Sequence, residues 1–155
     1  MKCYYYNSHI FIFQQGNLWR REDIATVRNI LKIIGLRKKG LSVNLSDDLN
    51  IRKVNLKWKG LDKATNVLSF PNEEQFNNCE TNMVYLGDII LAYETIEKER
   101  KIKNIDLRKH LAHILVHGIL HLKGYTHQSD RDTKLMQNEE IRILKNLKIK
   151  NPYTS

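Results

Sequence analysis

The sequence has few of the residues that cross-link or divide a chain. Its 155 residues include two prolines and two cysteines, Cys3 and Cys79. The cysteines do not form the Cys-x-x-Cys spacing of a zinc or redox motif, so we expect two free thiols in a reducing compartment. There is no internal repeat, low-complexity tract or linker rich in proline and glycine. Because this length is ordinary for one domain, we expect residues 1–155 to form a single domain.

Long apolar runs are also missing. The apolar run at residues 10–13 is too short for the core of a signal peptide, and no small-residue cleavage site follows it. No window approaches the roughly 18 apolar residues that a membrane-spanning helix requires. These absences predict a cytoplasmic protein without a membrane partner.

Acidic residues are the minority among the charged ones. Lysine and arginine number 26 against 17 aspartates and glutamates, which gives a formal net charge of +9 and a pI of about 9.6. This surplus favours a polyanionic partner, with nucleic acid first, over acidic small molecules or neutral peptides. Solvated lysine-rich faces and an AT-rich genome are alternative explanations for part of the charge. The basic residues gather in three segments, at 52–63, 100–109 and 142–150.

The pattern of apolar residues predicts a mixed order of strands and helices. Strands are expected where β-branched and aromatic residues gather, at 9–14, 41–45, 66–70 and 84–92. Helices are expected where apolar residues recur at helical spacing, at 18–36, 48–57, 93–103, 106–123 and 130–148. We therefore expect an α/β fold of the mixed α+β kind, with a small mixed β-sheet covered by helices. The strongly apolar helix at 106–123, in the C-terminal half, should be central.

Polar residues mark several expected boundaries. Asn17 is the expected N-cap of the first helix, while Ser46, Asp47 and Asp48 offer caps for the second. Residues 72–82 are polar and are expected to form a loop.

Gly87 lies inside the expected strand at 84–92. A glycine in a strand predicts a bulge or a close approach by another segment. Its neighbour Asp88 is a candidate acceptor for a metal ligand or a contact of the substrate, and a plain turn or bulge role is equally open.

The segment at 113–127 contains three histidines at the spacing of a metal site. His117 and His121 are four residues apart, so in a helix they lie on one face, separated by a rise of about 6 Å. Gly124 can take the left-handed conformation that ends a helix, which returns His127 over that face. Three neutral nitrogen ligands suit one Zn²⁺ and leave a fourth position open, as in catalytic sites. The alternative is a helix whose histidines only pack and form hydrogen bonds.

Two further residues of this segment define the chemistry. His113 lies one turn before His117, and we favour a role in supporting the ligands or in packing over a fourth-ligand role. The spacing of the three histidines also occurs in zinc proteases, which need a glutamate directly after the first histidine as general base. Gly118 occupies that position here, so peptide hydrolysis by that mechanism is disfavoured.

Three blocks of the sequence resemble the YbeY-type endoribonucleases, a bacterial family of metal-dependent proteins implicated in ribosomal RNA maturation and ribosome quality control. The blocks are Asn-Leu-Lys-Trp-Lys-Gly at 55–60 with Asp-Lys-Ala-Thr-Asn-Val-Leu-Ser-Phe-Pro at 62–71, Leu-Gly-Asp-Ile at 86–89, and the histidine segment. The resemblance implies a compact α/β fold, one Zn²⁺ held by His117, His121 and His127, and a nucleic-acid groove beside the metal. It also implies a single-strand-specific endoribonuclease acting on 16S ribosomal RNA, with the ribosome or small-subunit proteins as further partners.

The sequence departs from the family pattern at three positions. Lys59 stands where the family usually has an arginine that contacts substrate phosphate. As the candidate catalytic residue, Lys59 would stabilise charge on the phosphate, but it lacks the bidentate fork of arginine; without the resemblance it would read as a solvated surface lysine. Thr126 replaces an aspartate whose carboxylate could orient an imidazole. Ala64 replaces a proline, which should alter only the stiffness of the loop.

These residues favour metal-assisted cleavage of phosphodiester bonds in single-stranded RNA. No residue stands out as the general base, and the nucleophile is either water or the 2′-hydroxyl of the substrate. The alternative is a ribosome-binding or RNA-binding assembly factor in which the metal organises the fold and cleavage is weak or absent. A hydrolase of small substrates is less compatible with the basic composition.

Overall fold

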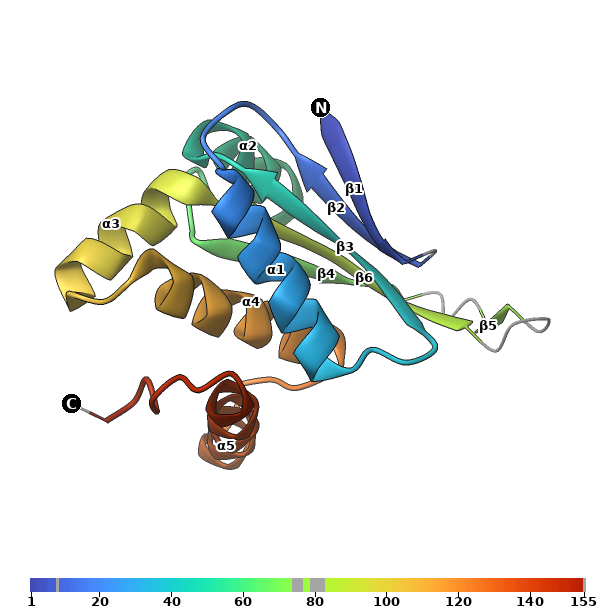
Figure 1. Cartoon of the computed structure of the whole chain (residues 1–155), viewed down its shortest axis with the longest axis vertical. Helices are drawn as coiled ribbons and strands as arrows, with labels where there is room; N and C mark the ends of the chain where they lie inside the picture. The colour runs from blue at the N-terminus through green and yellow to red at the C-terminus, as the bar shows by residue number, and fades with distance from the viewer. Residues whose placement is uncertain (8, 74–76, 79–82, 155) are drawn as a thin grey trace.

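The computed structural model describes residues 1–7, 9–73, 77–78 and 83–154, and it shows a mixed sheet with helices packed against it (Figure 1). The expected mixed α and β class is confirmed. In chain order the elements are β1 (Lys2–Asn7), β2 (Ile10–Gln14), α1 (Arg21–Ile34), β3 (Lys39–Ser46), α2 (Asp48–Lys59), β4 (Val67–Pro71), β5 (Asn77–Asn78), β6 (Met83–Ala92), α3 (Tyr93–Lys103), α4 (Leu107–Leu122) and α5 (Asp130–Asn146).

The described strands form one mixed sheet. Their order is β1-β2-β3-β6-β4, and β5 pairs with β6. β2, β3 and β6 run parallel to one another, whereas β1 pairs with β2 in antiparallel fashion, as β4 and β5 do with β6. β4 is therefore an edge strand of the described sheet, beside α4.

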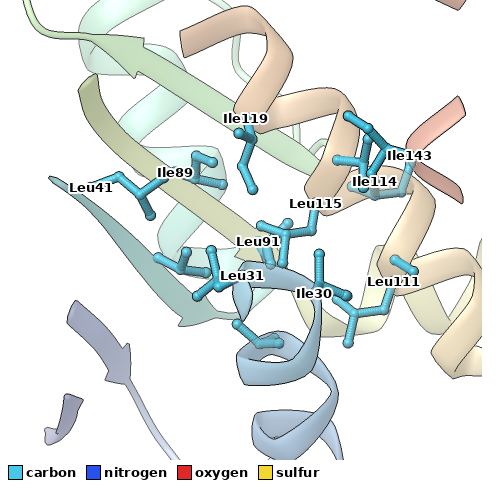
Figure 2. Close-up of a cluster of buried hydrophobic side chains, with 14 of the residues drawn as sticks. Ile30, Leu31, Leu41, Ile89, Leu91, Leu111, Ile114, Leu115, Ile119 and Ile143 are labelled. Carbon is cyan, nitrogen blue, oxygen red and sulfur yellow. The ribbon is translucent and has the colours of Figure 1, made fainter. Parts of the chain in front are cut away.

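α4 is the central helix, as its apolar sequence predicted. It packs against β4 and β6 of the sheet and against α1, α3 and α5. Figure 2 shows how its apolar side chains meet those of α1, β3, β6 and α5 in one cluster. The labelled side chains are Ile30, Leu31, Leu41, Ile89, Leu91, Leu111, Ile114, Leu115, Ile119 and Ile143. None of the helices in the described part of the chain is long and apolar enough to cross a membrane.

The start of α1 differs from the prediction. The helix begins at Arg21 rather than at residue 18, and Asn17 is not its N-cap. Trp19 is needed in the core instead, where its side chain is buried and its Nε1 donates to the Ser46 carbonyl at 2.8 Å. Residues 17–20 therefore connect β2 to α1, and the indole of Trp19 is held in the core by its hydrogen bond to the end of β3.

α2 begins as predicted and ends two residues later than expected. The Asp47 side chain accepts a hydrogen bond from the Asn50 N–H at 2.8 Å, which caps the first turn. The helix continues to Lys59 and stops at Gly60, whose φ of 70° is left-handed. Lys59 is thus the last helical residue and lies where α2 turns towards β4.

Two strands were not predicted. β1 pairs with β2, although the segment Lys-Cys-Tyr-Tyr-Tyr-Asn shows no alternation of polar and apolar residues. β5 pairs with the start of β6 within the stretch at 72–82 that was expected to be a loop. Residues 74–76 and 79–82 of the expected loop, which include Cys79, lie outside the described residues. The other cysteine, Cys3, is a free, exposed thiol.

Candidate metal centre

Three histidines converge where α4 ends. His117 and His121 lie on α4, which stops at Leu122, and His127 lies in the loop that follows. Gly124 has a φ of 100°, so the predicted left-handed turn is present. The ligand atoms of the three imidazoles all lie within 4.8 Å of one another. This group can hold a metal ion.

A hydrogen bond at Nδ1 fixes the orientation of each of the two helical histidines, His117 and His121. Nδ1 of His117 lies 2.5 Å from Glu140 Oε1, and Nδ1 of His121 lies 3.0 Å from the Tyr125 carbonyl oxygen. Because carboxylate and carbonyl oxygens only accept hydrogen bonds, both rings carry a proton on Nδ1 and leave a lone pair on Nε2.

The two Nε2 atoms face each other at 3.0 Å. Two lone pairs at that distance have no proton to share. Two nitrogens bound to one zinc ion at about 2.0–2.1 Å in tetrahedral geometry would lie about 3.3 Å apart. The donor set and its spacing therefore fit a divalent cation such as zinc.

The site is open to solvent on the side of His127. Burial, followed by the neighbouring His117, lowers the pKa of His121, which favours the neutral ring that binds metals. His127 is exposed. Thr126 donates to Asp132 at 3.4 Å, so the residue before the last histidine bonds to α5 rather than to an imidazole.

Glu140 of α5 supports the histidines from the side away from the cavity, and this role was not predicted from the sequence. Its side chain is 1% exposed, with Oε1 bonded to His117. Its Oε2 accepts from His113 Nε2 at 3.1 Å and from the Tyr153 hydroxyl. Burial would raise the pKa of Glu140, but these hydrogen bonds outweigh it and lower the pKa to about 2. The ionised carboxylate orients His117, as expected for the partner of a metal-binding histidine.

The sequence does contain a signal for Glu140. The buried apolar face of α5 includes Met136, Ile143 and Leu144. Glu140 lies four residues from both Met136 and Leu144, so an acidic residue occupies a core position of an amphipathic helix. An acid in that position needs a buried partner.

A cavity of about 590 Å³ opens over the histidines between α4 and the edge strand β4. Among the described residues, no acidic side chain lines it. The lining residues are Lys59, Thr65, Asn66, Val67, Leu68, Ser69, Pro71, His113, Ile114, His117, His121, Tyr125, Thr126, His127 and Tyr153. The structure thus brings Lys59 and His113 to the same cavity as the three histidines, and no like charge among the described lining residues opposes a polyanion there.

Asp88 is not brought to this cavity. Ile89, the next residue of β6, points at α4, since its Cδ1 lies 3.5 Å from where a Cβ on Gly118 would be. Alternate residues of a strand face opposite sides of the sheet, so Asp88 lies on the other face. There its Oδ1 accepts hydrogen bonds from the hydroxyls of Ser42 and Tyr85, both at 2.5 Å. The predicted bulge at Gly87 is present, with a φ of 139° and a shifted register.

Gly118 allows α4 to lie close to the sheet. A Cβ there would lie 3.1 Å from Ser69 Oγ and 3.2 Å from Val67 Cγ2, and Ser69 Oγ donates to the Gly118 carbonyl at 3.1 Å. A side chain at this position would require Ser69 and Val67 of β4 to shift by a few tenths of an ångström. The packing here therefore disfavours the side chain that a zinc protease uses as general base.

The sequence matches the family model described as Endoribonuclease YbeY over residues 14–148. A protein of that name from Sinorhizobium fredii is 46% identical over 115 residues, which cover 73% of this chain and 65% of the relative. The one from Nitrobacter winogradskyi is 44% identical over 115 residues, which cover 73% of this chain and 60% of the relative. The one from a Wolbachia of Drosophila simulans is 44% identical over 110 residues, which cover 71% of this chain and 70% of the relative. The chain thus spans less than two thirds of the length of the first two.

Among solved structures, the solution structure of TM1509 from Thermotoga maritima superimposes with a TM-score of 0.62. The match covers 94% of this chain and 99% of that one, at 23% identity. The two chains share the fold.

Proposed function

The chain belongs to the YbeY endoribonuclease family, and from that premise we propose that it is a metal-dependent endoribonuclease that cleaves single-stranded RNA in the cavity between α4 and β4. The observation that carries the proposal is one cavity that contains three convergent imidazoles and Lys59, with no acidic residue in its described lining. Such a cavity suits a phosphodiester, which carries one negative charge per nucleotide. We assign residues 1–155 to one domain with this activity.

In this proposal His117, His121 and His127 hold one Zn²⁺. When bound, the ion supplies Lewis acidity towards a phosphoryl oxygen and lowers the pKa of a water molecule. Glu140 holds the His117 ring and the Tyr125 carbonyl holds the His121 ring, so each keeps its Nε2 directed at the same point.

Lys59 binds the phosphate in this scheme. Its side chain is exposed at the end of α2 and lines the cavity with the histidines, so it can reach a phosphoryl oxygen and stabilise the charge that develops there. No carboxylate of the described residues lines the cavity, so none of them is placed to activate the nucleophile there. Water and the 2′-hydroxyl of the substrate are the two candidates.

The family resemblance supports a setting for this activity. We propose that the protein acts in the cytoplasm in the maturation of 16S ribosomal RNA and in ribosome quality control. The ribosome or small-subunit proteins would be its partners. The net charge of +9 supports a polyanionic target of this kind.

A second candidate is an RNA-binding assembly factor with weak or no cleavage. Lys59 favours it, because a lysine offers a single point charge where the family usually has the planar fork of an arginine. In that case the metal would chiefly support the fold.

The test is cleavage of a labelled single-stranded RNA by purified protein, before chelation, after chelation and after stoichiometric zinc is restored. We expect cleavage that requires zinc, spares a double-stranded RNA of the same sequence and is lost in His121→Ala, which also excludes a contaminating nuclease. Lys59→Gln should lower kcat by about tenfold to a hundredfold, while Lys98→Gln on the exposed face of α3 should not.

Folded, zinc-loaded protein that binds RNA without cleaving it would contradict the nuclease and support the assembly factor. Lys59→Arg would then show whether the missing fork silences the site. Protein that binds no RNA would contradict both candidates.

A further inference from the structure

A second cavity, of about 480 Å³, lies next to the first. It is lined by the end of α3 and the segment after it, by the first two turns of α4 and by the C-terminal segment 149–154. Three lysines, Lys103, Lys109 and Lys150, line it, and no acidic residue in the described part of the chain does. The proposed RNA cleavage does not use these residues.

The positive charges of the three lysines are not neutralised by ion pairs within the described residues. Within the described residues, none of them forms an ion pair with a carboxylate. Several arginines elsewhere are neutralised in this way: Arg52 lies 2.7 Å from Asp62, and Arg100 lies 2.5 Å from Glu97. A concave surface with unpaired ammonium groups and no acid attracts a polyanion.

The lining between the lysines is apolar. Ile105 is 36% exposed, and Ile149 and Pro152 complete this part of the wall. An inorganic anion would gain nothing from the apolar wall, and an apolar ligand would gain nothing from the lysines. A nucleotide matches both, because it combines a flat base with a charged phosphate.

The wall also contains an unsatisfied polar atom. His110 is fully buried, and its Nε2 lies 3.0 Å from Glu99 Oε1. Because Nε2 donates to that carboxylate, Nδ1 is the acceptor of the neutral ring, and it has no partner within the described residues. Because this nitrogen is itself buried, a ligand in the cavity does not reach it, and the lysines and the apolar side chains are the groups that a ligand can contact.

The two cavities share a wall. His113 lines both, Tyr153 lines the first, and its neighbours Pro152 and Thr154 line the second. The rings of His113 and Tyr153 meet edge to face with their centroids 5.5 Å apart. Ligand groups in the two cavities would therefore be separated by little more than these side chains, which suits successive nucleotides of one strand.

We propose that the second cavity binds a nucleotide of single-stranded RNA that flanks the cleaved bond. Its phosphates contact the lysines and its base packs on the apolar wall. This inference rests on the proposed function and assigns a substrate subsite to it. RNA that reaches across His113 and Tyr153 then binds more tightly than RNA that fills the first cavity alone.

The test compares a triple variant, Lys103→Gln with Lys109→Gln and Lys150→Gln, with a control of equal charge. The control is Lys32→Gln with Lys98→Gln and Lys134→Gln, three exposed lysines that line neither cavity. Steady-state cleavage by the zinc-loaded protein is measured on a long single-stranded RNA and on a dinucleotide. Equilibrium binding of the long RNA is measured by fluorescence anisotropy across a salt series, with the metal chelated so that the RNA stays intact.

We expect the cavity variant to raise KM and Kd for the long RNA by about tenfold or more, with kcat, zinc affinity and dinucleotide cleavage unchanged. The slope of log Kd against log salt should fall by about 1–2, as expected for two or three lost phosphate contacts on a single strand. The control variant should change Kd far less. Equal effects of the two triple variants would overturn the subsite and leave only general attraction by charge.

A charge-neutral variant tests the same cavity independently. Thr154→Trp would fill the space and should raise KM for the long RNA only, while Thr154→Ser, which keeps the hydroxyl bonded to the Asn151 carbonyl, should not. An unchanged KM in Thr154→Trp would contradict the subsite. Lysine-dependent binding without metal-dependent cleavage would refute the proposed nuclease and support the RNA site, so the two failures are distinguishable.

Discussion

Two carboxylates of this molecule accept hydrogen bonds in similar ways, but only one of them is connected to the histidines. Glu140 accepts from Tyr153 and from two imidazoles, whereas Asp88 accepts from Tyr85 and from Ser42. Glu140 lies behind the cavity on α5. Asp88 lies on the far face of the sheet from α4.

The difference shows what makes a hydrogen-bonded carboxylate relevant to a site. Both clusters satisfy their polar atoms locally, so hydrogen bonding alone does not distinguish them. Only Glu140 bonds to a residue whose other ring nitrogen faces the cavity, which lets it control the direction of a ligand. Asp88 stands in a block that resembles the family, but the strand turns its side chain away.

The largest expected effect is a loss of metal affinity when Glu140 is replaced. Glu140→Gln keeps the shape of the side chain but replaces one acceptor oxygen by an amide group that cannot accept from His117 or His113. We expect the affinity of the histidine site for Zn²⁺ or Co²⁺ to fall by about 10- to 100-fold. Competition with a chromogenic chelator measures it. The adjacent Glu139→Gln is the matched control. Equal metal affinities in Glu140→Gln and Glu139→Gln would mean that Glu140, like Asp88, does not support the histidine site.

Asp88→Asn should affect stability rather than the metal. The amide leaves the hydroxyls of Ser42 and Tyr85 competing for a weaker acceptor, which should lower the free energy of unfolding by about 1–3 kcal/mol. Urea unfolding gives this value, and the chelator competition should show an unchanged metal affinity. A loss of metal affinity like that of Glu140→Gln would mean that Asp88 reaches the site after all. Asp62→Asn, which breaks an exposed ion pair, should change stability less.

Removing the tyrosine hydroxyl from each cluster gives a smaller contrast. Tyr153→Phe deletes one of the three hydrogen bonds to Glu140, so metal affinity should fall by less than about tenfold, since one hydrogen bond contributes about 1 kcal/mol. Tyr85→Phe, its counterpart beside Asp88, should leave metal affinity unchanged. If both variants bound metal like the unmodified protein, the His117 ring would be held without help from the C-terminal segment.

The smallest expected effect is alkaline titration at Tyr85. Burial, and then the hydrogen bond to Asp88, raise the pKa of Tyr85 from 10.0 to about 12. A raised pKa in the folded state means that the stabilisation is complete below pH 10 and is lost as the pH rises through about 12. Unfolding experiments across this range should show a steeper loss of stability in the unmodified protein than in Tyr85→Phe. Parallel curves would show that Tyr85 titrates like an exposed tyrosine.

Much of the fold follows from local patterns in the sequence. The periodicity of residues 106–123 predicts α4, and Asp47 marks the start of α2, because caps and apolar spacing act within a few residues. The start of α1 and the strand β1 were not predictable in this way. Trp19 lies outside the helix and bonds to Ser46, a partner 27 residues away, whereas β1 pairs with the adjacent β2 but lacks the alternation of polar and apolar residues that marks a strand.

The sequence by itself determined that His117, His121 and His127 meet, since helix geometry and the turn at Gly124 act over a few residues. Tertiary structure alone decided that Glu140 supports them, that Lys59 shares their cavity and that Asp88 does not. The physical reason is the distance along the sequence over which each interaction acts. The helical repeat and left-handed turns set local geometry, whereas the packing of α5 on α4 and the side of the sheet that a strand residue faces depend on which segments the hydrophobic core brings together.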